Sequence, residues 1–344
     1  MKQTLPSTGY LILNLGTPRS PTTRDVRRYL HEFLMDPYVI DLPWILRKIL
    51  VAGFILPFRP KRSAAAYAKI WTNQGSPLAI HSQALQAELS KELEAPVAVA
   101  MRYGEPTIEL ALSQLKAAGV TDVVVAPLYP QYADSTVKTS LEAVGRHNPG
   151  FELHTLQPFY ARDEFILPLA EQITPCLQTA DHVLFSFHGL PEAHLERSDP
   201  GSHCLANENC CDIPSAAHAT CYRHQCFATV SALAQKLTLS ELQYSVSFQS
   251  RLGRQPWLQP YTDQLLAQLP DRGIKRLAVA CPSFVADNLE TLEEMGMQGR
   301  EIFMQAGGEH FELVPCLNQQ PQWVSGLANL LRHHTVAASS LTSS

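Results

Sequence analysis

The feature that most constrains the fold is the repeated alternation of short apolar runs with longer segments of helical periodicity. Runs rich in Val, Ile, Leu and Phe that alternate with helices are typical of βα units, which build parallel sheets covered by helices. The sequence predicts eight strands, at residues 10–15, 97–102, 123–128, 151–156, 182–187, 244–248, 276–281 and 311–314. The expected fold class is therefore α/β.

The eight predicted strands divide evenly between the two halves of the chain. With 344 residues, the chain is long enough for about two domains. We expect two similar doubly wound domains, each with a four-stranded, mainly parallel sheet flanked by helices, and an active site in the cleft between them. The first domain would cover residues 1–157, with 318–335 packing back on it, and the second would cover residues 158–317.

The charge of the chain argues against one large class of partner. Lys and Arg number 27 and Asp and Glu number 32, which gives a net charge of -5. Such a chain has no basic field that could neutralise a row of phosphates, so no nucleic acid is expected as a partner. Residues 1–7 are short and polar and carry no recognisable targeting sequence, so we expect a cytoplasmic protein.

An apolar stretch at residues 39–58 allows two interpretations. It contains charged residues and two prolines, and its uninterrupted apolar part is about half of the roughly 20 residues that a membrane span needs. It cannot cross a bilayer. It is either a buried helix or an exposed lip, at residues 44–58, that meets an apolar ligand or makes a peripheral contact with the inner face of the membrane.

Chemically active side chains follow the predicted strands at their carboxyl ends, where ligands of open α/β sheets bind. His188 and Gly189 follow the fifth strand, and Glu290 begins a helical segment that also contains Glu293 and Glu294. Spacings of three and four would place these carboxylates on one face of a helix. An imidazole opposite such a row suits a loosely held divalent ion, such as Fe(II) or Zn(II).

The sequence has no Walker loop, no G-x-G-x-x-G run and no G-x-S-x-G run. Nucleotide binding and α/β-hydrolase chemistry therefore have no support from motifs. Apolar and aromatic walls around one base and a few acids are typical of a pocket for a large, flat, apolar molecule.

Five motifs resemble the ferrochelatase family, and their order and spacing match it from about residue 9 to residue 332. They are the runs LNLGTP at 13–18, LYPQY at 128–132, SFHGLP at 186–191, FQSR at 248–251 with PWL at 256–258, and LETL at 289–292. The resemblance implies a lyase that inserts Fe(II) into a porphyrin with release of two protons, in the last step of haem biosynthesis. It implies that His188 takes pyrrole protons and handles the metal, and that Glu290 faces it across the pocket.

The same resemblance implies which side chains contact the porphyrin: Leu15, Arg59, Arg62, Ser76, Arg102, Tyr103, Tyr129 and Tyr132. Some relatives that act on coproporphyrin carry Tyr where this chain has Leu15, so protoporphyrin IX is the expected substrate and coproporphyrin the alternative. Many relatives have His where this chain has Asn288, so no metal-handling role is assigned to that position. A cobalt or nickel chelatase for another tetrapyrrole, and a non-catalytic porphyrin or metal carrier, remain as rival functions.

Five of the eight cysteines crowd into one segment, residues 201–226, which looks like an insert relative to shorter family members. They are Cys204, Cys210, Cys211, Cys221 and Cys226. Four of the five are expected to hold a [2Fe-2S] cluster, which some bacterial ferrochelatases carry. Zinc, with help from His203, His218 or His224, is the alternative, and free thiols are the third. Cys281 and Cys316 end apolar runs and are expected to be buried structural thiols.

Overall fold

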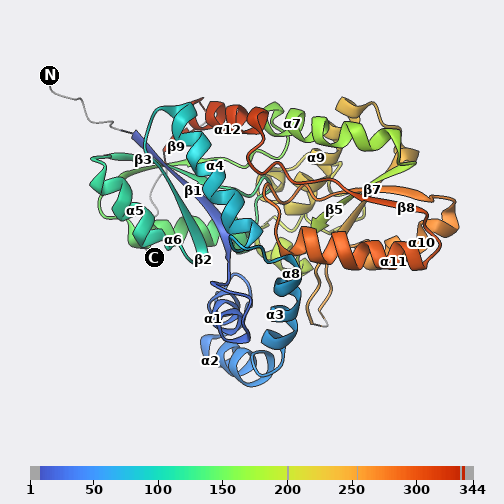
Figure 1. Cartoon of the computed structure of the whole chain (residues 1–344), viewed down its shortest axis with the longest axis horizontal. Helices are drawn as coiled ribbons and strands as arrows, with labels where there is room; N and C mark the ends of the chain where they lie inside the picture. The colour runs from blue at the N-terminus through green and yellow to red at the C-terminus, as the bar shows by residue number, and fades with distance from the viewer. Residues whose placement is uncertain (1–7, 200, 254, 334, 338–344) are drawn as a thin grey trace. The chain divides into compact units, whose positions relative to one another are not determined.

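The computed structural model describes residues 8–199, 201–253, 255–333 and 335–337 (Figure 1). Residues 1–7, in which we expected no targeting sequence, lie outside this part. The chain divides into two compact units. The first unit contains residues 1–128, 134–157 and the chain from residue 324 onward, and the second contains residues 129–133 and 158–323.

The sheet of the first unit has five strands in the order β2-β1-β3-β4-β9. The strands are β1 (Thr8–Thr17), β2 (Val97–Gly104), β3 (Asp122–Pro127), β4 (Glu152–Leu156) and β9 (Thr335–Ala337). The four strands expected in this half are confirmed, and they run parallel. The additional strand β9 pairs antiparallel with the edge strand β4. Three residues are too few to show a readable alternation, which is why the sequence did not predict β9.

Helices cover both faces of this sheet, because its central strand β1 is apolar on both sides. On one face Leu11 and Leu13 pack with buried residues of α5 and α6. On the other, Asn14 donates a hydrogen bond to Ser82 on α4. The helices of this unit are α1 (Thr23–Leu34), α2 (Trp44–Ile49), η1 (Leu50–Ile55), α3 (Arg59–Ile70), α4 (Pro77–Leu93), α5 (Ile108–Ala117), η2 (Asp134–Lys138) and α6 (Thr139–His147). The last helix, α12 (Pro321–His333), contains the boundary between the units.

The sheet of the second unit has four parallel strands in the order β6-β5-β7-β8. They are β5 (His182–His188), β6 (Tyr244–Gln249), β7 (Arg276–Ala280) and β8 (His310–Leu313), as the sequence predicts. Strand β5 lies between β6 and β7. Its pairing with β6 continues to His188 and Gln249, whereas its pairing with β7 stops at Phe185 and Ala280. The end of β5 therefore extends past β7.

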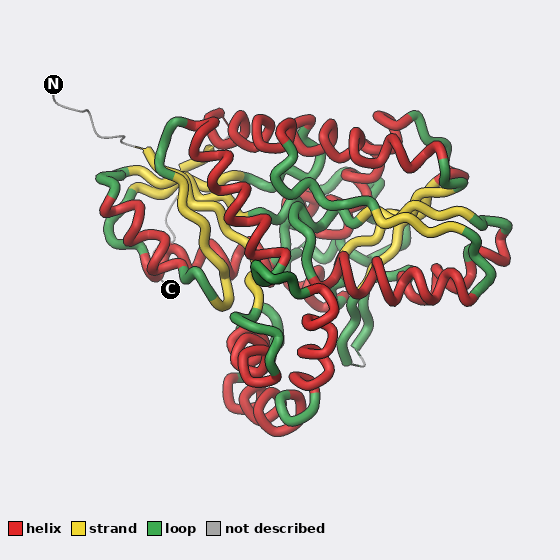
Figure 2. The backbone as a smooth tube through the Cα atoms, in the orientation of Figure 1, coloured by secondary structure: helices red, strands yellow, loops and turns green. Residues whose placement is uncertain are grey.

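Figure 2 shows helices on either side of this second sheet. One face packs against α10, η7 and α11 through side chains such as Leu266, Met295 and Phe303. On the other face Phe248 of β6 meets Phe227 of α9. The helices are α7 (Asp163–Ile173), η3 (Thr174–Gln178), α8 (Glu192–Arg197), η4 (Ala216–Ala219), α9 (Tyr222–Leu237), η5 (Glu241–Gln243), α10 (Thr262–Gln268), η6 (Pro270–Arg272), η7 (Glu290–Gly299) and α11 (Arg300–Gln305). The two helix-covered sheets confirm the expected α/β class.

The apolar stretch near residue 50 is not a buried helix, which was one of its two interpretations. It forms α2 and η1 in the first unit, and six of its large apolar side chains are exposed, from 53 % for Leu46 to 77 % for Phe58, whereas Val51 and Leu56 are buried. We call residues 44–58 the apolar lip. Its exposed large apolar side chains are Trp44, Ile45, Leu46, Ile49, Phe54 and Phe58. Among the helices described, none is long and apolar enough to span a membrane.

Candidate functional site

His188 is the last residue of β5, and the chain itself orients its imidazole. Nδ1 lies 2.7 Å from the carbonyl oxygen of Gly189. Because a carbonyl oxygen only accepts hydrogen bonds, Nδ1 carries the proton and Nε2 keeps its lone pair. The neutral ring therefore presents one atom that can bind a metal ion or accept a proton.

Burial and one carboxylate act in opposite directions on this imidazole. Burial lowers the pKa of His188, while the negative charge of Glu294 and the hydrogen bond to Gly189 raise it. Burial also raises the pKa of Glu294, and the charge of Glu290 raises it further, against the effects of Ser250 and His188. A neutral imidazole beside a carboxyl group that holds its proton more readily than usual is suited to proton exchange.

The carboxylates belong to η7, a π-helix in which hydrogen bonds run from residue i to residue i+5. Glu294 accepts a hydrogen bond from the hydroxyl of Ser250. Glu293 is buried and accepts one from Gln298 at 2.6 Å. We expected Glu290, Glu293 and Glu294 on one face of the helix, and that expectation assumed an α-helical turn. In the wider turn, Glu293 has a separate structural contact and Glu294 is the carboxylate that acts on His188.

Gln249, the last residue of β6, connects the segments that carry the histidine and the glutamates. Its side-chain amide donates to the carbonyl oxygen of Glu290 at 3.1 Å and accepts from Ser186 at 2.7 Å. Its backbone carbonyl accepts from the Gly189 amide at 2.7 Å. A Cβ at Gly189 would lie 2.8 Å from that carbonyl oxygen, so the close approach of the two backbones requires glycine here.

Asn288 uses its side chain to begin the π-helix. Its Oδ1 accepts from the backbone amides of Glu290 at 2.9 Å and Thr291 at 3.1 Å, and its Nδ2 donates to the Ala286 carbonyl. This arrangement is that of a helix N-cap, and it leaves the asparagine a structural role.

Tyr129 and Tyr132 belong to the second unit, like His188 and Glu290. Tyr129 is buried and Tyr132 is half-buried. The backbone amide of Tyr132 donates to the side chain of Gln225 on α9 at 2.7 Å. This run is therefore anchored to α9, the helix in which the cysteine-rich segment ends.

Arg102 and Tyr103, in the first unit, both bind Asp36. The guanidinium donates to the Asp36 carboxylate at 2.5 Å and the phenol donates to it at 2.9 Å. Thr139 adds a third donor at 2.6 Å. Asp36 is buried, so the charge of Arg102 is neutralised inside the unit.

Four further predicted porphyrin contacts also lie in the first unit. Leu15 is half-buried in β1, and Ser76, just before α4, is buried and accepts a hydrogen bond from Thr17 at 2.8 Å. Arg59 begins α3 and is half-buried, whereas Arg62 on the same helix is exposed. Both arginines therefore lie at or just after the apolar lip.

The cysteine-rich segment brings several thiols into contact. Hydrogen bonds link the thiol of Cys221 to those of Cys211 and Cys204, and the one from Cys211 is the main cause that lowers the pKa of Cys221 to about 5. Arg223 lies 3.5 Å from Cys210 Sγ and 3.4 Å from Cys211 Sγ. Burial and the hydrogen bonds to Cys221 raise the pKa values of Cys204 and Cys211, so Cys221 is the thiol whose surroundings favour thiolate, the form of cysteine that binds metals.

Backbone contacts hold this segment in place at its beginning. Asp199 accepts hydrogen bonds from the amides of Gly201 at 2.9 Å, His203 at 2.5 Å and Cys204 at 2.6 Å. These bonds, chiefly the one from Cys204, lower the pKa of Asp199. The aspartate thereby fixes the position of the first cysteine of the segment.

The three histidines of the segment direct ring nitrogens to backbone carbonyls. His203 Nε2 and His218 Nε2 lie 2.7 Å and 3.2 Å from the carbonyl oxygen of Cys210. His224 Nδ1 lies 2.9 Å from that of Cys211. These contacts support the loop backbone around the cysteines.

Three further cysteines, Cys226, Cys281 and Cys316, are also buried. Cys226, on α9, is completely buried, and burial raises its pKa well above the ordinary value. Cys281 and Cys316 are 5 % exposed, and burial also raises their pKa values, which confirms that they are buried thiols.

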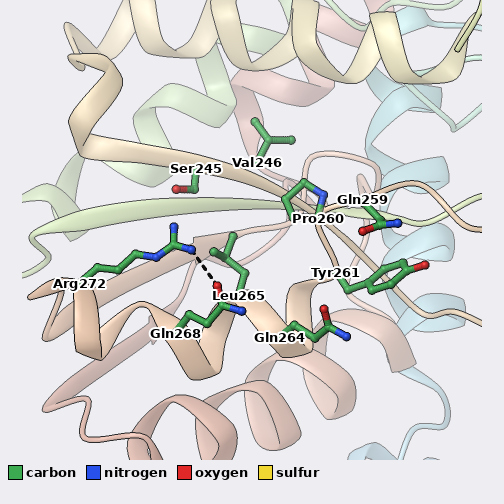
Figure 3. Close-up of a pocket in the computed structure, with 9 residues that line it drawn as sticks. All are labelled: Ser245, Val246, Gln259, Pro260, Tyr261, Gln264, Leu265, Gln268 and Arg272. Carbon is green, nitrogen blue, oxygen red and sulfur yellow. Dashed lines mark hydrogen bonds between the residues drawn. The ribbon is translucent and has the colours of Figure 1, made fainter. Parts of the chain in front are cut away.

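Two hollows in the second unit contain none of the predicted catalytic residues. One, of about 280 Å³, lies beside β6 and α10, where Gln268 accepts a hydrogen bond from Arg272 (Figure 3). The other, of about 510 Å³, lies between residues of α7 and α9. Neither is lined by His188 or by the glutamates of η7.

Comparison with solved structures identifies the fold. SirB from Bacillus subtilis with Fe3+ is 15 % identical and matches with a TM-score of 0.51 over 77 % of this chain and 92 % of that one. The sirohydrochlorin chelatase SirB from Bacillus subtilis subspecies spizizenii in complex with cobalt is 9 % identical, with a TM-score of 0.54 over 96 % and 95 %. The chain therefore has a chelatase-like fold.

Comparison of sequences is more specific. Ferrochelatase from Azotobacter vinelandii is 53 % identical over 94 % of this chain and 97 % of its own length. Ferrochelatase from Pseudomonas fluorescens is 51 % identical over 95 % and 98 %. A sequence model of the family described as Ferrochelatase matches residues 7–335. On this match and these relatives, the chain belongs to the ferrochelatase family.

Proposed function

We propose that this chain inserts Fe(II) into protoporphyrin IX and that His188 accepts the pyrrole protons. As a member of the ferrochelatase family, the chain is a metal-chelating enzyme of haem synthesis, with porphyrin and ferrous iron as substrates. The observation that carries the assignment of the base is the geometry of His188. Its Nδ1 proton is held by Gly189, so Nε2 is the lone pair offered to the substrate.

The reaction explains why the site has these residue types. Insertion removes two pyrrole protons and replaces the water around the iron, so it needs a base, a route for protons and weak metal ligands. His188 takes a proton at Nε2, and the carboxylates of Glu294 and Glu290 receive protons from it. One imidazole and two carboxylates leave coordination positions open, so the porphyrin can take the iron from them.

The porphyrin contacts remain those that the family resemblance implies. Tyr129 and Tyr132 would supply aromatic walls, Leu15 would favour protoporphyrin over coproporphyrin, and Arg59, Arg62 and Ser76 would meet the propionates. Arg102 and Tyr103 would shape the porphyrin edge without offering a free charge, because Asp36 already binds both.

The test of this function is His188→Ala, assayed with Fe(II) and Zn(II) on protoporphyrin and coproporphyrin. Loss of a general base should lower kcat at least about 100-fold, while porphyrin binding, followed by fluorescence, stays within about threefold. His310→Ala, at an exposed position of the same unit, is the matched control and should keep full activity. Retention of a tenth of the turnover by His188→Ala would reject the base. Binding without turnover by the unsubstituted chain would favour a carrier.

The cysteine-rich segment is proposed to hold a [2Fe-2S] cluster through Cys204, Cys210, Cys211 and Cys221. The contacts among these thiols and the cation of Arg223 support this choice. Cys226 is left over, because the hydrogen-bond partner of its thiol is the phenol of Tyr222. The cluster has two irons, so the adjacent Cys210 and Cys211 can serve different irons. When bound, it would supply a cross-link to a loop with few large apolar side chains, and one-electron redox capacity.

The spacing of the thiols supports a cluster over zinc. A zinc ion bound by thiolates at about 2.3 Å sets the sulfur atoms about 3.8 Å from one another. Among the residues described, which include all eight cysteines, the one set of three possible ligand atoms within 4.8 Å of one another comes from Asp122, Glu152 and His154. The thiols are thus more widely spread than a single tetrahedral ion requires.

Metal analysis of protein purified without oxygen tests the cluster. We expect about two irons and two inorganic sulfides per chain, with visible absorption that Cys204→Ser and Cys221→Ser abolish. Cys226→Ser is the matched control and should keep the absorption. One zinc and no sulfide would reject the cluster in favour of a zinc site. Absorption that is lost in Cys226→Ser would show that Cys226 is a ligand, against the proposed set of four.

A cytoplasmic location, with reversible contact between the apolar lip and the inner face of the membrane, completes the proposal. All eight cysteines are unpaired, as is usual in a reducing compartment. The six exposed apolar side chains of the lip, followed by Lys61 and Arg62, suit an anionic lipid surface.

A further inference from the structure

Tyr222 holds the backbone of the proposed base. It is the first residue of α9, and its phenol donates a hydrogen bond to the carbonyl oxygen of His188 at 2.8 Å. Tyr222 is buried, so neither group can exchange this partner for water. The carbonyl of a residue at the end of a strand needs such a partner, because no further ladder hydrogen bond is available to it.

A second residue fixes the other backbone group of His188. The His188 amide donates to Ser283 Oγ at 3.1 Å, and the phenol of Tyr222 also interacts with Ser283. Tyr222 and Ser283 thus clamp both backbone groups of His188. The orientation of the ring depends on that backbone, because Nδ1 is bound to the next carbonyl, that of Gly189.

Tyr222 is equally tied to the cysteine-rich segment. It directly follows Cys221, which is the N-cap of α9 and whose Sγ accepts from the His224 amide at 3.5 Å. One turn later, the thiol of Cys226 contacts the phenol of Tyr222. The position of Cys221 therefore sets where α9 begins, and the beginning of α9 sets where the phenol lies.

We infer that Tyr222 is the positioning residue through which order in the cysteine-rich segment fixes the imidazole of His188. This inference rests on the proposed role of His188 as the base and on the proposed [2Fe-2S] cluster in the cysteine-rich segment. When the segment is cross-linked, Cys221 holds the first turn of α9 and Tyr222 holds the His188 carbonyl. When the cross-link is removed, the first turn loosens and the base loses its fixed position, although no residue that contacts substrate has changed.

The first test is Tyr222→Phe in the full chain, which removes only the hydroxyl. We expect unchanged iron content and an unchanged KM for porphyrin, with kcat about tenfold lower, because the base is displaced while the pocket walls remain. Tyr244→Phe, in the same unit, is the matched control and should match the parent chain. Loss of iron from Tyr222→Phe would overturn the inference, because Tyr222 would then be needed for the proposed cluster to bind. An unchanged kcat would overturn it as well.

The second test measures the connection without an activity assay. Amide hydrogen exchange of the peptide containing His188 and Gly189 is compared before and after an iron chelator removes the metal. In the parent chain, removal should speed exchange there about tenfold, and in Tyr222→Phe exchange should already be fast and should change less than about twofold. An equal response in both proteins, or no response in the parent, would overturn the inference. Absent turnover in the parent would reject the proposed function but would leave this measurement valid.

Discussion

The side-chain amide of Gln249 donates a hydrogen bond to the backbone carbonyl of Glu290 across 3.1 Å. One residue at the end of β6 thereby fixes the first residue of the π-helix η7. The backbone carbonyl of the same Gln249 accepts the amide of Gly189, the residue after the proposed base. The distance between His188 and the glutamates thus depends on Gln249, which itself carries no charge.

We predict that Gln249→Leu lowers kcat about tenfold, equivalent to about 1.4 kcal/mol in the activation barrier, because η7 loses the contact that places Glu290. Losing the hydrogen bonds of Gln249 to Glu290 and Ser186 should also lower the free energy of unfolding by about 1–3 kcal/mol. Steady-state kinetics and urea unfolding measure the two effects. Gln268→Leu on α10 is the control and should change neither by much. A stability loss with unchanged kcat would show that Gln249 only supports the fold.

Glu294→Gln should move the acid limb of the kcat/KM profile to lower pH. The proposed base acts when His188 is neutral, so activity falls as the pH drops through the pKa of His188. The charge of Glu294 raises that pKa, and its removal therefore lowers the pKa and extends activity toward acid. We expect kcat at the optimum to fall at least about tenfold, because a proton acceptor is lost.

The control for this prediction is Glu293→Gln, which changes the neighbouring carboxylate. Glu293 is bound to Gln298 and should leave the acid limb in place. The pH profiles of both variants and the parent chain, measured with Zn(II) to avoid oxidation of iron, check the prediction. A shift of the limb to higher pH in Glu294→Gln, or an equal shift in Glu293→Gln, would contradict it.

The sequence predicted what depends on local pattern. All eight expected strands form, because apolar alternation is a local property, and His188 lies at the end of β5 as its position after an apolar run indicated. The π-helix could not be read in the same way. Its wider turn depends on the capping by Asn288 and on the contacts of Ser250 and Gln249, which come from other parts of the chain.

The ion pair of Arg102 with Asp36 could not be predicted from the sequence either. Asp36 is 66 residues away and belongs to the loop after α1, so no spacing rule connects the two. Exposure of the apolar lip was also undetermined, because an apolar run of that length suits a core helix and a surface patch alike. In each case the missing information is a long-range contact or the lack of a covering layer.

Asp36→Asn should destabilise the first unit strongly. Asp36 is buried and accepts hydrogen bonds from Arg102, Tyr103 and Thr139, so loss of its charge leaves the guanidinium of Arg102 uncompensated. Breaking a buried ion pair in this way costs about 3–5 kcal/mol. Glu88→Gln, which removes an exposed pair with Lys91, should cost at most about 1 kcal/mol. Denaturant unfolding of both variants measures the difference, and equal losses would contradict the buried role.

The last prediction concerns binding of the apolar lip to lipid. Ile45 and Phe54 are 63 % and 68 % exposed, and full transfer of each side chain into lipid would stabilise the bound state by about 1.5–3 kcal/mol. The parent chain should therefore float with liposomes that contain anionic lipid at low salt. The double variant Ile45→Ser with Phe54→Ser should float at least about tenfold less, since it loses most of that transfer energy.

The matched control is Leu242→Ser, which removes a side chain that is 89 % exposed but lies far from the lip in sequence, in the second unit. It should float like the parent. Equal loss in the control would attribute binding to general apolarity, and a parent chain that stays in solution would leave the lip without a lipid partner.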